Sequence, residues 1–197
     1  YDQAAWRGTW AQDGGVLMNQ SIHALDLLFF LMGSHVTEAV AMIARQTHSM
    51  EAEDLALGLL RLENGSYCSV EGTTSTRPSD PRAGFTILFS HGSIRAGIRS
   101  GKPYFDIRGK ANRKLNGRYL RRFISETMRC QGIRGFIRAF HPHSGILRDF
   151  CLSITNDTVP LADGISGKQA VEAVLAMYRS AKTGCRVRLP LEESASL

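Results

Sequence analysis

The sequence predicts an α+β domain: an open, mainly antiparallel β-sheet with helices packed on one face. Apolar residues recur at helical spacing near both ends of the chain, in residues 19–32, 144–155 and 166–184. Between residues 35 and 98 the spacing changes to two, which is typical of strands, and short turn signals make neighbouring strands antiparallel. With 197 residues and 43% apolar content, the chain is long enough to bury a core.

The first predicted helix, residues 19–32, carries polar groups in an apolar run. Asn19 suits the N-cap position, and Gly33 suits a left-handed C-cap. At about 100° per residue, Asn19, His23 and Asp26 fall in one narrow stripe. A helix that is apolar nearly all round is expected to be buried, where unpartnered polar groups cost several kcal/mol. The stripe therefore faces either an internal hydrogen-bond network or a ligand cavity.

A glycine pair, Gly14 and Gly15, directly precedes this helix. Paired glycines allow the backbone to approach another group closely, and a helix N-terminus favours anions. The pair favours a ligand site at the start of the helix. The structural alternative is that Asp26 merely holds His23 in one tautomer.

The central part of the chain predicts successive strands in residues 35–47, 55–62 and 66–76, followed by residues 84–90 and 92–98. Tight turns are predicted at Glu63-Asn64-Gly65 and at His91-Gly92. Residues 103–143 show weak periodicity and are interpreted as a long insertion with one or two helical pieces. The sheet face that the helices leave free could pair with a second copy.

The last predicted helix, residues 166–184, begins at a capping box formed by Ser166 and Gln169 and ends at Gly184. Its apolar stripe consists of Val171, Val174, Leu175, Tyr178 and Ala181.

Composition narrows the class of protein. No apolar run is longer than six residues, the length of residues 27–32, which is too few to cross a bilayer. The first residues show no charged leader followed by an apolar stretch and no initiating Met, so we expect a cytoplasmic protein whose sequence starts upstream. The four cysteines form no CxxC motif, which favours reduced thiols, and no metal site is expected.

Positive charge is concentrated in residues 108–138, which hold ten Lys or Arg and one acid, against a net charge of +6 for the whole chain. Such a block binds nucleic acid or another polyanion, gathers anionic ligands such as nucleotide sugars, or is simply solvated. Its aromatics are Tyr119, Phe123 and Phe136, without the regular aromatic–basic interleaving of single-strand binders. Nucleic acid is therefore the weaker interpretation.

The stretch "WRGTWAQDGGVLMNQSIHALDLLFFLMG" resembles the C-terminal domain signature of the glucose–fructose oxidoreductase / inositol dehydrogenase / rhizopine-catabolism (Gfo/Idh/MocA) family. "EAEDLALGLLRLENGSYCSVEGTTS" resembles the family's sheet-forming segment, and "HSGILRDFCLSITNDTVPLADGISGKQAVEAVLAMYRSAKTGCRVRLPL" its closing helices and final strand. The resemblance covers most of the chain except roughly residues 100–140. The signature falls on Gly14, Gly15, Asn19, His23 and Asp26.

The resemblance implies an NAD(P)-dependent oxidoreductase that acts on a sugar, polyol or nucleotide-sugar hydroxyl. Residues 1–197 would be its substrate-binding and oligomerisation domain, assembling as a homodimer or homotetramer through the sheet face. The family's N-terminal Rossmann domain, with a GxGxxG turn and a Glu-Lys-Pro motif, is absent from this sequence. NAD or NADP would be bound mainly by that domain, and this part alone would be inactive. A non-catalytic oligomerisation module is the alternative.

Residue roles follow from the same resemblance. His23 is the expected acid/base, since an imidazole titrates near neutral pH. Asn19 stands where many relatives have Asp, and an amide cannot accept a proton, so it would only orient the substrate. Asp26 is expected to orient the helix or loop. The other expected substrate contacts are Gly15, Trp10 and Arg7, with Arg7 either pairing with a substrate carboxylate or phosphate or packing on Trp6.

Overall fold

The structure of the chain is a computed structural model that describes residues 4–76, 82–138 and 143–192. It divides into two compact units. The first unit comprises residues 1–79 and 164–197, and the second comprises residues 80–163. Each unit is described by itself below.

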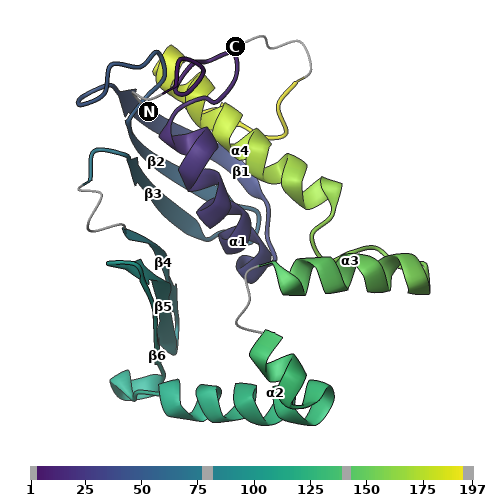
Figure 1. Cartoon of the computed structure of the whole chain (residues 1–197). Coiled ribbons are helices and arrows are strands. Elements are labelled where there is room, and N and C mark those ends of the chain that lie inside the picture. The colour runs from purple at the N-terminus through teal and green to yellow at the C-terminus, as the bar shows by residue number, and fades with distance from the viewer. Residues whose placement is uncertain (1–3, 77–81, 139–142, 193–197) are drawn as a thin grey trace. The chain divides into compact units, whose positions relative to one another are not determined.

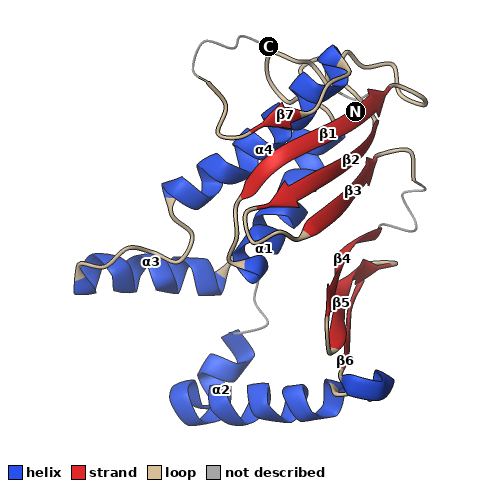
Figure 2. Cartoon of the chain, turned by 180° about the vertical axis from the view of Figure 1, so that it is seen from behind, coloured by secondary structure: helices blue, strands red, loops and turns tan. Residues whose placement is uncertain are grey.

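The first unit is a four-stranded antiparallel sheet with helices on one face (Figure 1). Seen from behind, the opposite face of the sheet carries no helix (Figure 2). The fold class expected from the sequence is thereby confirmed. The sheet order is β3-β2-β1-β7, formed by β1 (Val36–Ala44), β2 (Leu55–Leu62), β3 (Tyr67–Thr73) and β7 (Val187–Arg188). The helical elements are a π-helix, η1 (Leu17–Ser21), and the α-helices α1 (Ile22–Met32) and α4 (Gly164–Thr183).

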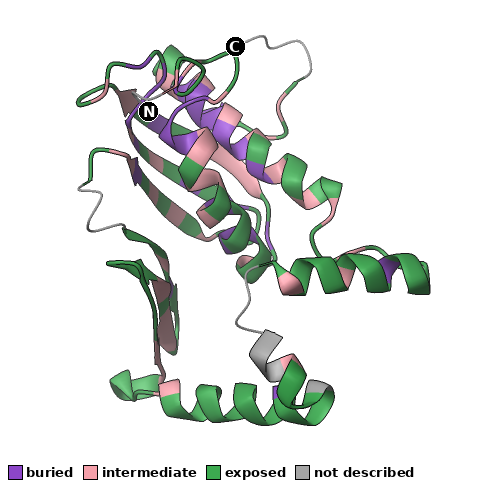
Figure 3. Ribbon diagram, in the orientation of Figure 1, coloured by how far each residue is buried: buried purple, intermediate pink, exposed green. Residues whose placement is uncertain are grey.

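The core lies between this sheet and α4 (Figure 3). The predicted stripe of α4 is partly wrong, because Val171 is 38% exposed while Ala173, Ala176 and Met177 are fully buried. The small Ala173 and Ala176 let α4 approach the sheet closely, and Gly58 leaves room for Met177. A Cβ on Gly58 of β2 would lie 2.4 Å from Met177 Cε.

The observed ends of α4 agree only in part with those predicted from the sequence. The helix begins at Gly164, two residues before Ser166, so the predicted capping box is wrong. It ends at Thr183, and Gly184 follows with a φ of 69°, as the closing glycine predicts.

α1 is buried on one side only, through Leu25, Leu28 and Phe29. Leu27, Phe30 and Leu31 are each about half exposed, so the expectation of a helix buried all round is wrong. The predicted left-handed C-cap is confirmed at Gly33, where φ is 56° and ψ is 36°.

The second unit contains a separate three-stranded antiparallel sheet, so the single meander expected from the sequence is wrong. Its third strand and a long helix occupy the part of the chain that was interpreted as an insertion with helical pieces. The strands are β4 (Arg82–Phe89), β5 (Gly92–Arg99) and β6 (Lys102–Arg108). The helices are η2 (Lys110–Asn112), α2 (Asn116–Arg138), with a non-helical residue at Gly132, and α3 (Ser144–Asn156), which matches its prediction.

The second unit has little interior. Among its described residues, Ile87, Thr127 and Ser153 are the buried ones. The unit carries fifteen Lys or Arg and six Asp or Glu, whereas the first unit carries nine and twelve. Nowhere in the described ranges is a helix both long and apolar enough to cross a bilayer.

Candidate functional site

The polar end of the first predicted helix is held by Asp13. One oxygen of the Asp13 carboxylate accepts a hydrogen bond from the backbone N–H of Gly8 at 3.2 Å, and the other accepts one from Asn19 Nδ2. Asn19 Oδ1 in turn accepts a bond from Gln20 Nε2 at 2.6 Å. Asn19 is therefore not an N-cap: it lies inside η1, and Asp13 fixes its amide. The position of Asp13 beside the glycine pair was the signal for this role.

A π-turn follows the first α-type hydrogen bond of this helix, which runs from the backbone N–H of Asn19 to Gly15 O. The backbone N–H of Ile22 donates to Leu17 O, five residues earlier. π-turns frequently occur at functional sites. Because the wider turn changes the angle per residue, the predicted alignment of Asn19 with His23 and Asp26 does not follow from α-helical geometry. Asn19 is half-buried, whereas His23 and Asp26 lie on the exposed side of α1.

The side chains of His23 and Asp26 form no hydrogen bond or ion pair with any residue for which the structure gives a position. The alternative that Asp26 holds His23 in one tautomer is therefore not observed. The imidazole is open to solvent and to an incoming ligand. The orienting role of Asp26 stays a prediction.

The start of this helix is also held by a buried carboxyl, Glu53, for which the sequence predicted no role. The side chain is 2% exposed. Glu53 Oε1 accepts hydrogen bonds from the backbone N–H of Leu17 and from Tyr178 Oη, both at 2.9 Å. Its backbone oxygen accepts a third from the N–H of Val16 at 2.9 Å. Glu53 therefore caps the first turn of the helix from across the fold.

Burial dominates the electrostatics of this contact. It raises the pKa of Glu53, the hydrogen bonds from Leu17 and Tyr178 oppose that change, and the neighbouring Asp54 charge adds to it. Burial and the nearby Glu53 also raise the pKa of Tyr178 far above the neutral range, so its hydroxyl remains a donor. Glu53 Oε2 is buried without a hydrogen-bond partner among the described atoms.

Gly15 lies directly against this carboxyl. A Cβ at position 15 would stand 2.0 Å from Glu53 Oε2 and 2.3 Å from its backbone oxygen. The close approach predicted from the glycine pair is thus made by Glu53. A substrate contact at Gly15 stays a prediction.

The same contact tests whether this helix could hold a dinucleotide phosphate. The N–H groups of Val16 and Leu17, which such a phosphate would use, already donate to Glu53. The residues at this helix terminus do not fit a pyrophosphate.

Trp10 and Arg7 flank the turn differently. The Trp10 ring stands edge-on to Tyr178, with 5.1 Å between centroids, and is 51% exposed. It therefore links the buried Glu53–Tyr178 pair to the surface. The Arg7 guanidinium lies 5.3 Å from the Trp6 ring centroid, the packing that was the alternative to a substrate contact.

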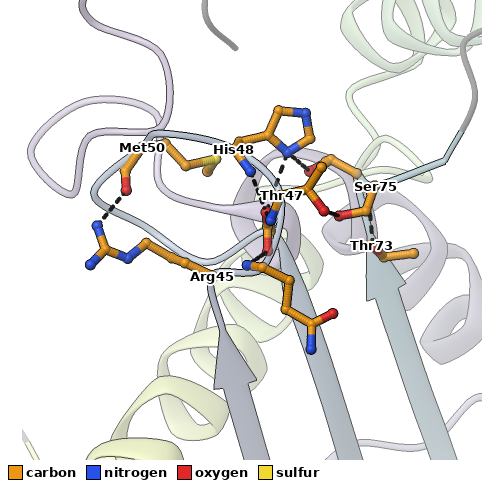
Figure 4. A network of polar contacts seen from close by, with 9 residues as sticks. Arg45, Thr47, His48, Met50, Thr73 and Ser75 are labelled. Carbon is orange, nitrogen blue, oxygen red and sulfur yellow. Dashed lines mark hydrogen bonds and ion pairs between the residues drawn. The ribbon is translucent and has the colours of Figure 1, made fainter.

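Asp54, the next residue, holds a different loop. Its carboxylate accepts hydrogen bonds from the backbone N–H groups of Gln46, Thr47 and His48 at 2.7 to 2.8 Å. Burial opposes its charge, but these bonds and one from the His48 ring outweigh burial and lower the pKa of Asp54 to about 2. Figure 4 shows His48 and Thr47 in this loop, beside Ser75 at the end of β3. Asp54 thus fastens the β1–β2 loop, whereas Glu53 fastens the helix.

A cavity of about 270 Å³ lies elsewhere in the first unit, lined by residues of β1, α4 and the segment after β7, including His35, Glu63 and Glu172. None of the predicted site residues lines it. The described part of the chain contains no group of three His, Cys, Asp or Glu side chains suited to a metal ion. All four cysteines are free thiols.

The comparisons decide the family. The model of the GFO/IDH/MocA C-terminal domain matches residues 1–95, the part that holds the glycine pair, η1, α1 and Glu53. The structural neighbours are dehydrogenases of this type. Over residues 1–95 this chain belongs to the GFO/IDH/MocA C-terminal domain family. No curated protein matches it in sequence.

Solved structures of this family resemble the chain over nearly its whole length. The WlbA dehydrogenase from Bordetella pertussis, in complex with NADH and UDP-GlcNAcA, is 30% identical, with a TM-score of 0.76, and the match covers 98% of this chain and 53% of that one. The WlbA dehydrogenase from Chromobacterium violaceum, with the same two ligands, is 30% identical with a TM-score of 0.73 and coverages of 98% and 51%. The UDP-N-acetylglucosamine 3-dehydrogenase GnnA from Acidithiobacillus ferrooxidans shares the fold at 17% identity, with a TM-score of 0.61 and coverages of 85% and 48%. The GFO/IDH/MocA domain described here thus spans about half the length of these relatives.

Proposed function

We propose that this GFO/IDH/MocA domain supplies the substrate site and the assembly surface of an NAD(P)-dependent dehydrogenase that oxidises a hydroxyl of a nucleotide sugar. The supporting observation is the 30% identity over 98% of the chain to WlbA, whose structure contains NADH and UDP-GlcNAcA. The nucleotide sugar is one of the three substrate classes that the resemblance implies, beside a sugar and a polyol.

The proposed chemistry for this chain centres on His23. Oxidation of a secondary alcohol requires removal of the hydroxyl proton as hydride leaves the carbon, and an exposed imidazole without an internal partner is suited to accept that proton. Asn19, one turn earlier, would orient the sugar through its amide, which Asp13 holds in place. Trp10 and Arg7 lie on the loop before the helix and would contact the rest of the substrate.

The dinucleotide would be bound mainly by a Rossmann domain outside this chain. The N-terminal amides of the helix are occupied by Glu53, and the sequence holds no GxGxxG turn. The free cysteines agree with a cytoplasmic location, which we infer for the protein.

The free sheet face is the proposed assembly surface. It presents a patch of exposed apolar side chains across paired strands, with Met42 opposite Leu57 and Val40 opposite Leu59. Met42 and Tyr67 are each 75% exposed. A patch of this kind marks an interaction site, and a second copy of the same sheet is the proposed partner. Sedimentation of the chain tests this directly: a dimer or tetramer is expected, and a monomer at micromolar concentration contradicts it.

The test of the catalytic proposal uses the full-length protein. His23→Ala is expected to abolish NAD(P)H formation from UDP-sugar substrates while the circular dichroism spectrum stays unchanged. His35→Ala is the matched control, because His35 is also exposed but lies at the cavity near β1. Unchanged turnover in His23→Ala would remove His23 from the mechanism.

The positive charge of the second unit supports one alternative function, polyanion binding, which the same assay can test. Its surplus of nine positive charges could bind a polyanion instead of assisting a nucleotide sugar. Polyanion binding would appear as an affinity for nucleic acid that falls steeply with salt, without any turnover of UDP-sugars.

A further inference from the structure

Two neighbouring acids, Glu53 and Asp54, are both buried in the first unit, at 2% and 0% exposure. Both accept backbone hydrogen bonds at the start of β2. Both carboxylate oxygens of Asp54 are used by the β1–β2 loop. Glu53 places one oxygen on the helix start and leaves the other, Oε2, without a partner among the described atoms. An unsatisfied buried oxygen is costly, so a gain elsewhere must explain its retention.

The contacts of Glu53 converge on the segment that carries the proposed site. Its backbone oxygen and Oε1 hold the amides of Val16 and Leu17, and Leu17 O then accepts the π-turn bond from Ile22. Asn19 lies inside that turn. His23 is the second residue of the α-helix that follows it.

We propose that Glu53, with Tyr178, is a positioning residue: its carboxyl fixes the π-turn at Leu17–Ser21 and thereby sets where Asn19 and His23 project. The inference rests on the proposed function of His23. Tyr178 donates to Glu53 Oε1 from the C-terminal half of α4, so the carboxyl ties the π-turn to a helix that packs in the core. Glu53 touches no proposed reacting atom and acts only through the backbone.

The contacts that hold the π-turn join residues that lie far apart in the sequence. Glu53 lies 36 residues after Leu17, and Tyr178 lies 125 residues after Glu53. No local capping bond is present at either end of η1: neither Val16 nor Ser21 makes a side-chain cap. The Glu53 carboxyl therefore holds the backbone at the start of the turn, at Leu17, while Asp13 holds the Asn19 side chain. Because a displacement of about 1 Å in a catalytic group costs about 100-fold in rate, a loosened turn should be visible in turnover.

The experiment compares Glu53→Ala, Glu53→Gln and Asp54→Asn in the complete protein, measuring kcat and KM for a UDP-sugar. Glu53→Ala is expected to lower kcat by about 10- to 100-fold with a smaller change in KM. Glu53→Gln keeps an acceptor oxygen for Leu17 and Tyr178 and should restore kcat to within about threefold of wild type. Asp54→Asn is the matched control: it weakens a different loop and should leave kcat within about twofold.

Two results overturn the proposal. One is a Glu53→Ala variant with kcat within twofold of wild type. The other is an Asp54→Asn variant that loses as much kcat as Glu53→Ala, because the effect would then be general loss of stability. If Glu53→Ala does not fold, Tyr178→Phe takes its place, since it removes only the hydroxyl that donates to Oε1. It should lower kcat about three- to tenfold, and an unchanged kcat contradicts the proposal.

A structural readout separates this proposal from the proposed function. In amide exchange on the chain, Tyr178→Phe should speed exchange of the Leu17 and Ile22 amides by at least tenfold, whereas Asp54→Asn should not. Faster exchange in Tyr178→Phe, combined with no UDP-sugar turnover by the wild-type protein, would contradict the proposed function but not the positioning role. Unchanged exchange at Leu17 would sink the positioning role, whatever the activity.

Discussion

The first unit buries fourteen residues in one cluster, whereas in the second unit the single buried apolar residue among those described is Ile87. The first unit has a surplus of acids and the second a surplus of nine positive charges. The first unit thus holds its own shape, while the apolar side chains of the second, such as Ile133 and Ile154, are largely exposed. All residues proposed for chemistry lie on the unit that builds its own core.

The difference between the two units indicates which of them can hold catalytic side chains in fixed positions. Groups that must be held within a fraction of an ångström need neighbours with locked positions. Glu53, Tyr178 and Gly15 provide such neighbours in the first unit. The second unit offers charge rather than rigid packing, which suits attraction of an anionic substrate and not its orientation.

The largest expected effect on the free energy of unfolding comes from shortening a buried side chain of the first unit, compared with an exposed one of the second. Leu60→Ala in β2, where Leu60 is 1% exposed, should lower the free energy of unfolding by about 3 kcal/mol. Ile154→Ala in α3, where Ile154 is 68% exposed, should change it by less than about 0.5 kcal/mol. Urea denaturation measures both. Equal losses would mean that the second unit is covered in solution and that the contrast is wrong.

Gly15→Ala should destabilise the first unit by about 2–3 kcal/mol, because its Cβ would collide with the side chain and backbone of Glu53. Gly167→Ala is the control: the residue lies in α4 with no atom near an added Cβ, and helix propensity should stabilise it by up to about 1 kcal/mol. A Gly15→Ala variant as stable as wild type would show that the helix start does not lie against Glu53.

The two neighbouring acids should give opposite pH dependences. The folded-state pKa of Asp54 is lowered from 3.8 to about 2, so its stabilisation is fully present above pH 4 and is lost as pH falls through 2. That loss is about 2 kcal/mol, and Asp54→Asn should abolish it. The pKa of Glu53 is raised above its usual value of 4.5 in the folded state. The stabilisation from its protonated carboxyl is therefore fully present below pH 4.5 and is lost as the pH rises through the folded-state pKa. Thermal unfolding of Asp54→Asn and Glu53→Gln between pH 2 and 8 measures both slopes. A parallel response of the two variants contradicts the assignment.

The smallest expected effect is at Asn19. Asn19→Asp would set a second carboxylate against Asp13, so stability at neutral pH should fall by about 1 kcal/mol. The fold should persist, and a change in substrate preference is measured as a change in KM between UDP-sugars. The double variant Asp13→Asn, Asn19→Asp exchanges the two groups and should regain the lost stability. Failure of the double variant to recover would show that the two side chains do not interact.

Much of the first unit could be predicted because its signals are local. The β2 strand was predicted at its observed bounds, and Gly33 and Gly184 close their helices as expected. The start of the first helix could not be predicted. A π-turn held by a carboxyl 36 residues away replaces the N-cap that Asn19 suggested, and no local pattern reports such a contact.

The second unit was predicted least well. β6 and α2 lie in a segment where charge obscures the apolar period, and the division into two sheets depends on pairings that a run of strands does not specify. At the candidate site, the roles of the expected residues stay predictions, and the contacts that hold the segment carrying them were missed. The Glu53-Asp54 pair before an apolar strand was the available signal, since two acids there are retained only if each has a partner.

Native-state amide hydrogen exchange of the chain tests most directly whether the unit that carries His23 supports itself. Amides of β1, β2, α4 and Leu17 are expected to exchange only through global unfolding, while those of β4–β6, α2 and α3 exchange at least a hundredfold faster. Uniform protection across both units, or a Leu17 amide that exchanges as fast as those of α2, would contradict this expectation.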